Sequence, residues 1–172
     1  EFLQNKARDQ GLDVADEQDT MQEIMDKGTT VFHRDGDRRI YYDYHIKGFL
    51  KESARVQNGQ SGVSNVKALR SKVDSTVFVS PRRIVLNVPA EGKIEYLERP
   101  LRAQTMQGER VALARSEMLP IGTWFECQLT LLAGQITEKI LRELLEYGAF
   151  KGMGQWRNGG YGRFEYELQD AK

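Results

Sequence analysis

A run of spaced glycines near the end of the chain is the feature with the clearest chemical meaning. Residues 152–162 follow the pattern G-x-G-x5-G-x-G, with glycines at Gly152, Gly154, Gly160 and Gly162. Glycine adopts positive φ without steric cost and places no side chain between the backbone amides and a ligand. Successive exposed amides can form a concave anion-binding site. The spacing therefore predicts a loop that holds phosphate, or a tight structural crossover between a helix and a strand, which would need the same glycines.

Cations and aromatic residues surround these glycines. Lys151, Arg157 and Arg163 would neutralise phosphate charge. Trp156 or Tyr161 would offer a flat face on which a base stacks. This combination favours a nucleic-acid ligand over a purely structural turn.

Two further pairs of cations are candidates for phosphate contacts. Lys47 and Lys51 are four residues apart, so they share one face of a predicted helix. Arg82 and Arg83 follow a proline between two predicted strands, where a basic hairpin tip would grip a polyanion. Solvated surface side chains are the alternative for all four. We include them in the predicted nucleic-acid-binding set.

The elements that position these residues are predicted from hydrophobic periodicity. Helical patterns cover residues 16–27, 46–56, 66–73 and 137–147, and the last helix is capped by Thr137 and ended by Gly148. Strand patterns cover residues 31–34 and 39–42 around an Asp-Gly turn, 76–79, 84–86, 123–131 and 161–168. Residues 89–120 have a poor pattern. The order predicts an α+β fold, with a ferredoxin-like (RRM-like) antiparallel sheet, helices on one face and long loop insertions.

Charge is unevenly distributed along the chain. The 25 bases and 25 acids cancel, but residues 1–30 carry eight acids and three bases, which leaves 22 bases and 17 acids in residues 31–172. We predict an acidic helical segment over 1–30, either solvated or covering a basic face, and one basic domain over 31–172. This charge pattern is weak support for a polyanion partner.

The apolar content excludes some classes of protein. No apolar run approaches the roughly 20 residues that a membrane-spanning helix needs, so we expect no membrane role. The single cysteine, Cys127, cannot form an intramolecular disulfide, and its apolar surroundings predict a small buried residue. These features are typical of a cytoplasmic protein, in the host cytoplasm if the chain is phage-encoded.

The end of the chain resembles a known family. The helix, glycine loop and strand over 137–166 look like the C-terminal signature of the RAMP superfamily, ferredoxin-like proteins that form guide-binding backbone and guide-processing subunits of CRISPR effector complexes. The stretch from Tyr44 to Glu52 is similar to the lysine-glycine start of the first helix in backbone-type members, where that segment approaches the guide RNA. The order of elements also resembles that of bacteriophage proteins related to this superfamily. The resemblance implies RNA binding.

Binding is favoured over catalysis. Some backbone subunits of this superfamily cleave RNA with an aspartate near the first helix, but Asp35, Asp37 and Asp43 do not align with it. Neither His33 nor His45 has a recognisable catalytic setting. We therefore predict an RNA-binding or single-strand-binding protein with no catalytic residue, metal or cofactor. The alternative is a structural or interaction protein that forms a homo-oligomer or binds a protein partner, and an endoribonuclease is the least favoured class.

Overall fold

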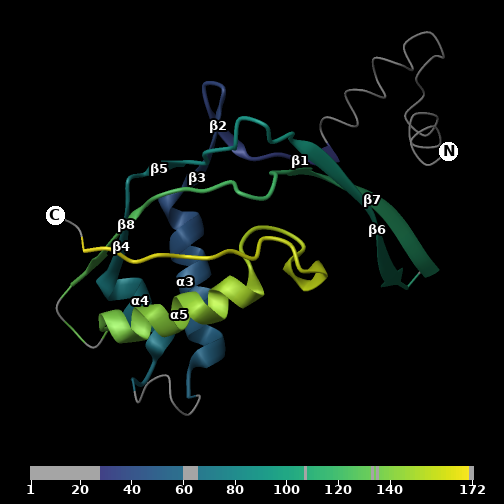
Figure 1. Cartoon of the computed structure of the whole chain (residues 1–172). Coiled ribbons are helices and arrows are strands. Elements are labelled where there is room, and N and C mark those ends of the chain that lie inside the picture. The colour runs from purple at the N-terminus through teal and green to yellow at the C-terminus, as the bar shows by residue number, and fades with distance from the viewer. Residues whose placement is uncertain (1–27, 60–65, 107, 133, 135, 171–172) are drawn as a thin grey trace, which may run out of the picture. The chain divides into compact units, whose positions relative to one another are not determined.

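The computed structural model describes residues 28–59, 66–106, 108–132, 134 and 136–170, and its fold is α+β (Figure 1). The chain divides into two compact units. One combines the residues up to His33 with Asn87–Trp124, and the other combines Arg34–Leu86 with Phe125–Lys172. The predicted helix over 16–27 and nearly all of the acidic segment 1–30 lie outside the described residues. No helix in the described part is long and apolar enough to cross a membrane.

The first unit is built on a long β-hairpin. Strand β6 (Glu95–Thr105) pairs antiparallel with β7 (Gly108–Met118) along its whole length. Strand β1 (Thr29–Thr30) adds a short parallel pairing to β7 at Arg115 and Ser116. The poor pattern of residues 89–120 predicted no strand, whereas β6 and β7 cover most of this range.

The hairpin was missed because it lacks a buried face in the residues whose side chains are described. Apolar alternation appears in a sequence when one face of a strand is buried and the other is solvated. Here Tyr96 and Leu113 are exposed, and the only side chains of this unit described as buried belong to Ser116 and Glu117. The Glu117 carboxylate accepts a hydrogen bond from the Phe32 amide at 3.0 Å.

The second unit contains the hydrophobic core, which lies between helices and short strands. Helix α3 (Asp43–Gln57) buries a stripe at helical spacing, and so does α5 (Glu138–Lys151). Helix α4 (Leu69–Thr76) adds Leu69 and Val73 to the same cluster. The predictions of α3 and α5 are confirmed, whereas α4 begins and ends three residues later than predicted.

Short antiparallel strands complete the second unit. Strands β2 (His33–Asp35), β3 (Arg38–Tyr42) and β5 (Arg83–Val85) form one sheet in the order β2-β3-β5. Strands β4 (Val77–Ser80) and β8 (Gln128–Leu131) form another. Gly36, with φ of 61°, lies in the predicted hairpin turn. The described strands thus form separate small sheets, and the strand predicted over 123–131 is confined to its last four residues.

Helix α5 begins as predicted but ends later. The Thr137 hydroxyl accepts a hydrogen bond from the Ile140 amide at 3.4 Å. Gly148 was predicted to end the helix, which is wrong, because the helix continues to Lys151 and Gly152 is its C-cap. Gly148 is buried, and a methyl group there would collide with the ring of Phe49. This glycine allows α3 and α5 to pack closely.

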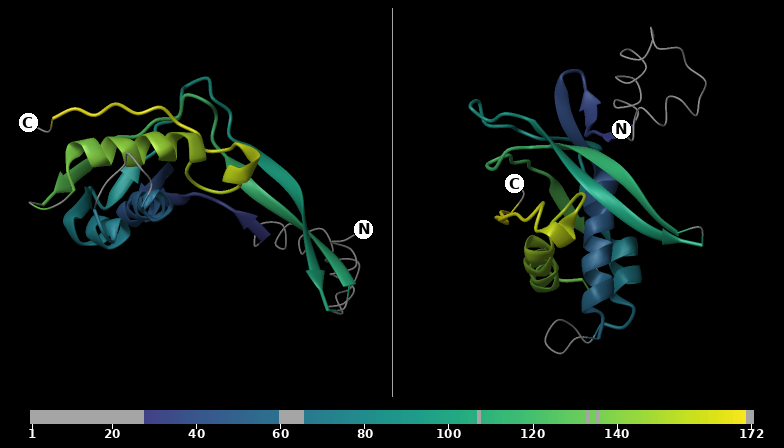
Figure 2. Two further views of the ribbon diagram at one scale, coloured as in Figure 1. Left: turned by 90° about the horizontal axis from the view of Figure 1, so that it is seen from below. Right: turned by 90° about the vertical axis from the view of Figure 1, so that its right-hand side faces the viewer.

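The prediction of a strand over 161–168 is also wrong. The described residues after Gly162 form no ladder, although Phe164, Tyr166 and Leu168 pack on the core while the residues between them are exposed. This segment lies beside α5 (Figure 2), where the Phe164 amide donates to the Ala149 carbonyl at 3.4 Å. The alternation therefore reflects packing against a helix instead of strand pairing.

Candidate nucleic-acid interface

The glycine loop, residues 152–162, is closed at its base. The Met153 amide donates to the Gly162 carbonyl at 2.8 Å. Gly152 and Gly162 both have positive φ, 86° and 73°. A Cβ at Gly152 would lie 2.6 Å from the Tyr161 carbonyl oxygen, and one at Gly162 would collide with the Met153 carbonyl. The outer glycines of the motif are thus required by the closure of the loop itself.

Several amides of the loop are used internally. The Gly152 amide donates to the Gly148 carbonyl at 2.7 Å, and the Gly160 amide donates to the Arg157 carbonyl at 3.0 Å. The Gly159 amide donates to the Trp156 carbonyl at 2.9 Å. These groups, with the Met153 amide, are therefore not available to a phosphate. Among the described residues, no hydrogen-bond acceptor faces the amides of Gly154, Tyr161, Gly162 and Arg163.

The two aromatic residues of the loop stack on each other. The rings of Trp156 and Tyr161 are 4.9 Å apart between centroids, and their planes differ by 11°. Trp156 has φ of 53°, in the left-handed region that non-glycine residues rarely adopt. A Cβ at Gly159 would lie 3.0 Å from the indole, so the absence of a side chain there leaves room for the ring. Trp156 remains 39% exposed.

The three cations of the loop have different environments. Arg157 donates to the Glu52 carboxylate of α3 at 2.7 Å. The hydrogen bond from Arg157 is the main cause that lowers the pKa of Glu52. Lys151 donates to the Asn158 amide oxygen at 2.9 Å, so no acid neutralises its charge through this contact. Arg163 is exposed and forms no ion pair with a described residue.

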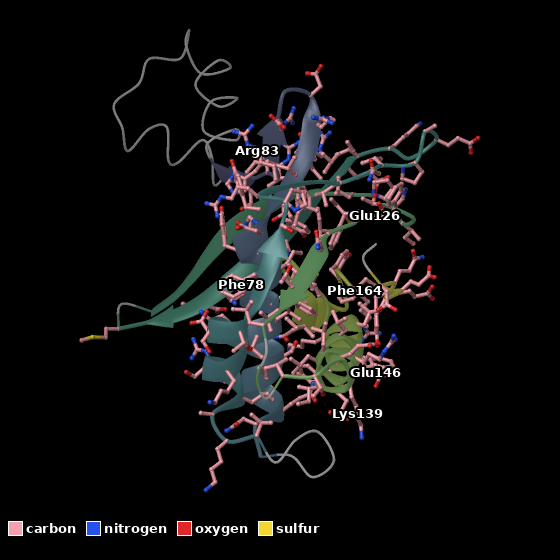
Figure 3. All side chains as sticks on the ribbon, turned by 90° about the vertical axis from the view of Figure 1, so that its left-hand side faces the viewer. Phe78, Arg83, Glu126, Lys139, Glu146 and Phe164 are labelled. Carbon is pink, nitrogen blue, oxygen red and sulfur yellow. The ribbon has the colours of Figure 1, made fainter. Side chains whose placement is uncertain are left out.

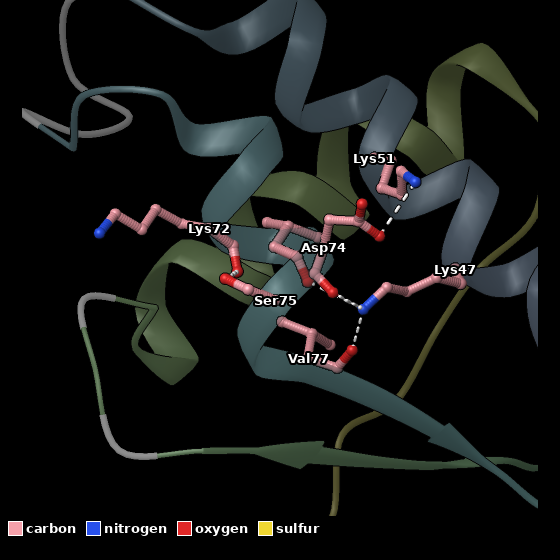
Figure 4. Close-up of polar contacts among 7 residues, drawn as sticks. Lys47, Lys51, Lys72, Asp74, Ser75 and Val77 are labelled. Atoms are coloured by element: carbon pink, nitrogen blue, oxygen red, sulfur yellow. Dashed lines mark hydrogen bonds and ion pairs between the residues drawn. The ribbon is translucent and has the colours of Figure 1, made fainter.

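Lys47 has a structural role that the sequence did not indicate. Its ammonium group donates to the carbonyl oxygens of Val73 and Asp74, at 2.9 and 2.8 Å, and to that of Val77 (Figure 4). It therefore caps the C-terminal end of α4, where carbonyl groups lack helical partners. Burial lowers the pKa of Lys47, while the Asp74 charge opposes this change.

Lys51 is paired on the same surface. Its ammonium group lies 2.9 Å from the Asp74 carboxylate, and the pKa of Asp74 is lowered, chiefly by this hydrogen bond. A phosphate at Lys47 or Lys51 would have to replace these contacts. Neither residue supports the predicted phosphate site.

The arginines after β4 are also paired with acids. Arg82 donates to Asp43 at 2.6 Å, and Arg83, at the start of β5 (Figure 3), donates to Asp35 at 3.0 Å. Both side chains are nevertheless largely exposed, at 67% and 59%. Asp35, one of the acids of the hairpin turn, thus serves as an ion-pair partner.

Sequence reasoning missed a cluster of rings at the junction of β3 and α3. We call Tyr42, Tyr44, His45 and Arg82 the ring cluster. Tyr42 and Tyr44 stack with centroids 5.3 Å apart, and the Tyr44 and His45 centroids are 4.3 Å apart. The Arg82 guanidinium carbon lies 5.5 and 5.4 Å from the two tyrosine centroids. Four aromatic residues between positions 41 and 45 were the available signal.

Comparisons with models of known protein families and with curated protein sequences find no match to the chain. The resemblance of residues 137–166 to the RAMP superfamily accordingly stays a prediction.

Proposed function

We propose that the chain binds single-stranded nucleic acid, RNA in the first instance, at the tip of the glycine loop. The observation that carries the proposal is the stacked pair of Trp156 and Tyr161. Two residues after Tyr161 lies the exposed Arg163, which has no ion-pair partner among the described residues. Stacking of a base on an aromatic side chain contributes about 1–3 kcal/mol and tolerates any sequence.

The charges of the loop support an anionic ligand. Lys151 and Arg163 form no ion pair with a described residue, although the Glu52 carboxylate, which pairs with Arg157, also interacts electrostatically with Lys151. The successive amides of Tyr161, Gly162 and Arg163 are the part of the loop that can still receive a phosphate. The proposed phosphate contact is therefore narrower than the whole glycine motif, and it excludes Lys47.

The wider assignment belongs to the same proposal. It comprises a ferredoxin-like arrangement of the strands, a relationship to RAMP proteins or their phage relatives, homo-oligomer formation and a cytoplasmic location. The proposal includes binding without cleavage. In support, the His45 ring accepts a hydrogen bond from the Tyr42 amide at 2.9 Å, so this histidine has a structural partner.

Binding of fluorescein-labelled 12-mer oligouridine, measured by anisotropy at low salt, tests the proposal. Trp156→Ala and Arg163→Ala should each weaken binding by roughly tenfold. Lys139→Ala, which removes an exposed cation of α5 outside the loop, is the control and should bind like the parent. Affinity should fall as salt rises. Unchanged binding of both loop variants, or no binding by the parent, would overturn the proposal.

A second candidate function is self-association or binding of a protein partner. One observation favours it: the first unit exposes large apolar side chains, including Val31, Ile121 and Trp124, and none of its described hydrophobic side chains is buried. Exposed apolar groups of this kind are typical of interaction surfaces. Light scattering over a range of protein concentrations would detect self-association, which should persist at high salt and without nucleic acid.

A further inference from the structure

Polar contacts centred on Asp43 hold the ring cluster in a fixed arrangement. The Asp43 carboxylate accepts two hydrogen bonds, one from the Tyr44 amide at 2.8 Å and one from the Arg82 guanidinium at 2.6 Å. The Asp43 amide donates to the Arg82 carbonyl at 3.1 Å. The Tyr42 and Tyr44 ring planes differ by 13°. These contacts fix the start of α3 to the segment after β4, so the rings need little ordering when a ligand arrives.

The cluster faces solvent although rings usually contribute to a core. Tyr44 is 47% exposed, and Tyr42 is half-buried. Neither belongs to the hydrophobic core of the second unit. Burial of a large aromatic side chain against a ligand contributes more binding free energy than burial of a small one. Flat rings beside a guanidinium are suited to a planar, electron-rich partner. The arrangement therefore fits a ligand that presents a flat ring and carries negative charge.

Tyr41 connects this cluster to the glycine loop. Its ring lies 5.3 Å from that of His45, and its hydroxyl oxygen is 3.4 Å from the position that a Cβ at Gly154 would take. Tyr41 is itself half-buried, and burial raises the pKa of its hydroxyl. Rings thus extend from the loop to Arg82 within the second unit.

We propose that the ring cluster is a second base-stacking site, in which an unpaired nucleobase stacks on Tyr44 and Arg82 contacts the neighbouring phosphate. This inference rests on the proposed function and specifies its ligand as unpaired bases instead of a duplex. Arg82 has donors beyond the one that Asp43 occupies, so it can contact a phosphate without breaking that ion pair.

The test compares two probes of equal charge: a 12-mer oligothymidine and a 12-mer of the same phosphates with abasic sugars throughout. Tyr44→Ala should weaken oligothymidine binding by roughly tenfold and change abasic binding by less than about twofold. Tyr44→Phe keeps the ring and should bind oligothymidine like the parent. Alanine is a good helix former, so the first turn of α3 should persist, and circular dichroism checks this.

Tyr96→Ala is the matched control. Tyr96 is 45% exposed and also lies beneath an arginine, with Arg115 4.3 Å from its centroid, but it belongs to the first unit. The Tyr96→Ala variant should bind oligothymidine and the abasic 12-mer with the affinities of the parent. An equal loss on the two probes, or no loss, in Tyr44→Ala would overturn the inference. If Trp156→Ala still weakened binding in that case, the proposed function would stand, whereas a parent protein that binds neither these probes nor oligouridine would remove both.

Discussion

The Arg157 guanidinium lies 2.7 Å from the Glu52 carboxylate, so a residue at the loop tip is joined to the middle of α3. The two positions are 105 residues apart in sequence. Both side chains are partly buried, at 27% and 33% exposure, so this pair is better shielded than the Arg142–Glu138 pair of α5. It fixes the tip of the loop against the body of the second unit.

Glu52→Gln is expected to lower the free energy of unfolding at pH 7 by about 0.5–1 kcal/mol. The folded-state pKa of Glu52 is lowered, so its stabilising contribution is present above the unfolded pKa. It is lost as the pH falls from about 4.5 through the folded pKa. Urea unfolding of the parent and the variant should therefore differ at pH 7 and converge in acid. Glu138→Gln, in the more exposed pair with Arg142, should show a smaller difference.

Replacement of Lys47 by methionine should destabilise the protein by about 1.5–3 kcal/mol, because the carbonyls of Val73, Asp74 and Val77 lose a charged donor. Methionine keeps most of the apolar stem. Urea unfolding measures the change, and Lys139→Met is the surface control with an expected change below about 0.5 kcal/mol. Equal stability of the two variants would contradict the capping role of Lys47.

Two helical glycines should respond to alanine with opposite signs. Gly48 of α3 has open space where the alanine methyl group would lie, so Gly48→Ala should stabilise the protein by about 0.5–1 kcal/mol through helix propensity. Gly148→Ala should destabilise it, because the methyl group would overlap the Phe49 ring. Thermal unfolding of both variants gives the comparison. A stabilised Gly148→Ala protein would show that α3 and α5 are not packed as described.

The glycines of the loop should also differ. Gly160 has φ of 85° and open space, so Gly160→Ala should cost about 1 kcal/mol, from backbone strain alone. Gly162→Ala adds a collision with the Met153 carbonyl and should cost more. Chemical denaturation ranks the two variants, and the reverse order would contradict the closed base of the loop.

The sequence predicted elements well where one face is buried. Helices α3 and α5 were found because Leu50 and Leu144 belong to stripes that recur with the helical period. The β6–β7 hairpin was missed because its pairing leaves residues such as Leu113 exposed, so no alternation results. Periodicity reports burial, and it cannot distinguish a paired strand from the segment after Gly162 that packs on α5.

The candidate site was predicted less well than the fold, because charge partners are set by tertiary structure. The sequence showed that Arg82 and Lys47 are cations, but their partners, Asp43 and the carbonyl of Val73, follow only from the packing of α3 against its neighbours. The rings at 41–45 were visible in the sequence. Their convergence with Arg82 was not, since it depends on the register of β3 with β5.

The bond between Met153 and Gly162 has a consequence for protein engineering. It joins the outgoing helix to the returning segment at the base of the loop, so that this junction does not depend on the residues at the loop tip. Sequences transplanted into residues 155–159 should therefore keep the packing of the second unit when they retain Arg157, which pairs with Glu52, and Gly159, which leaves room for the indole ring.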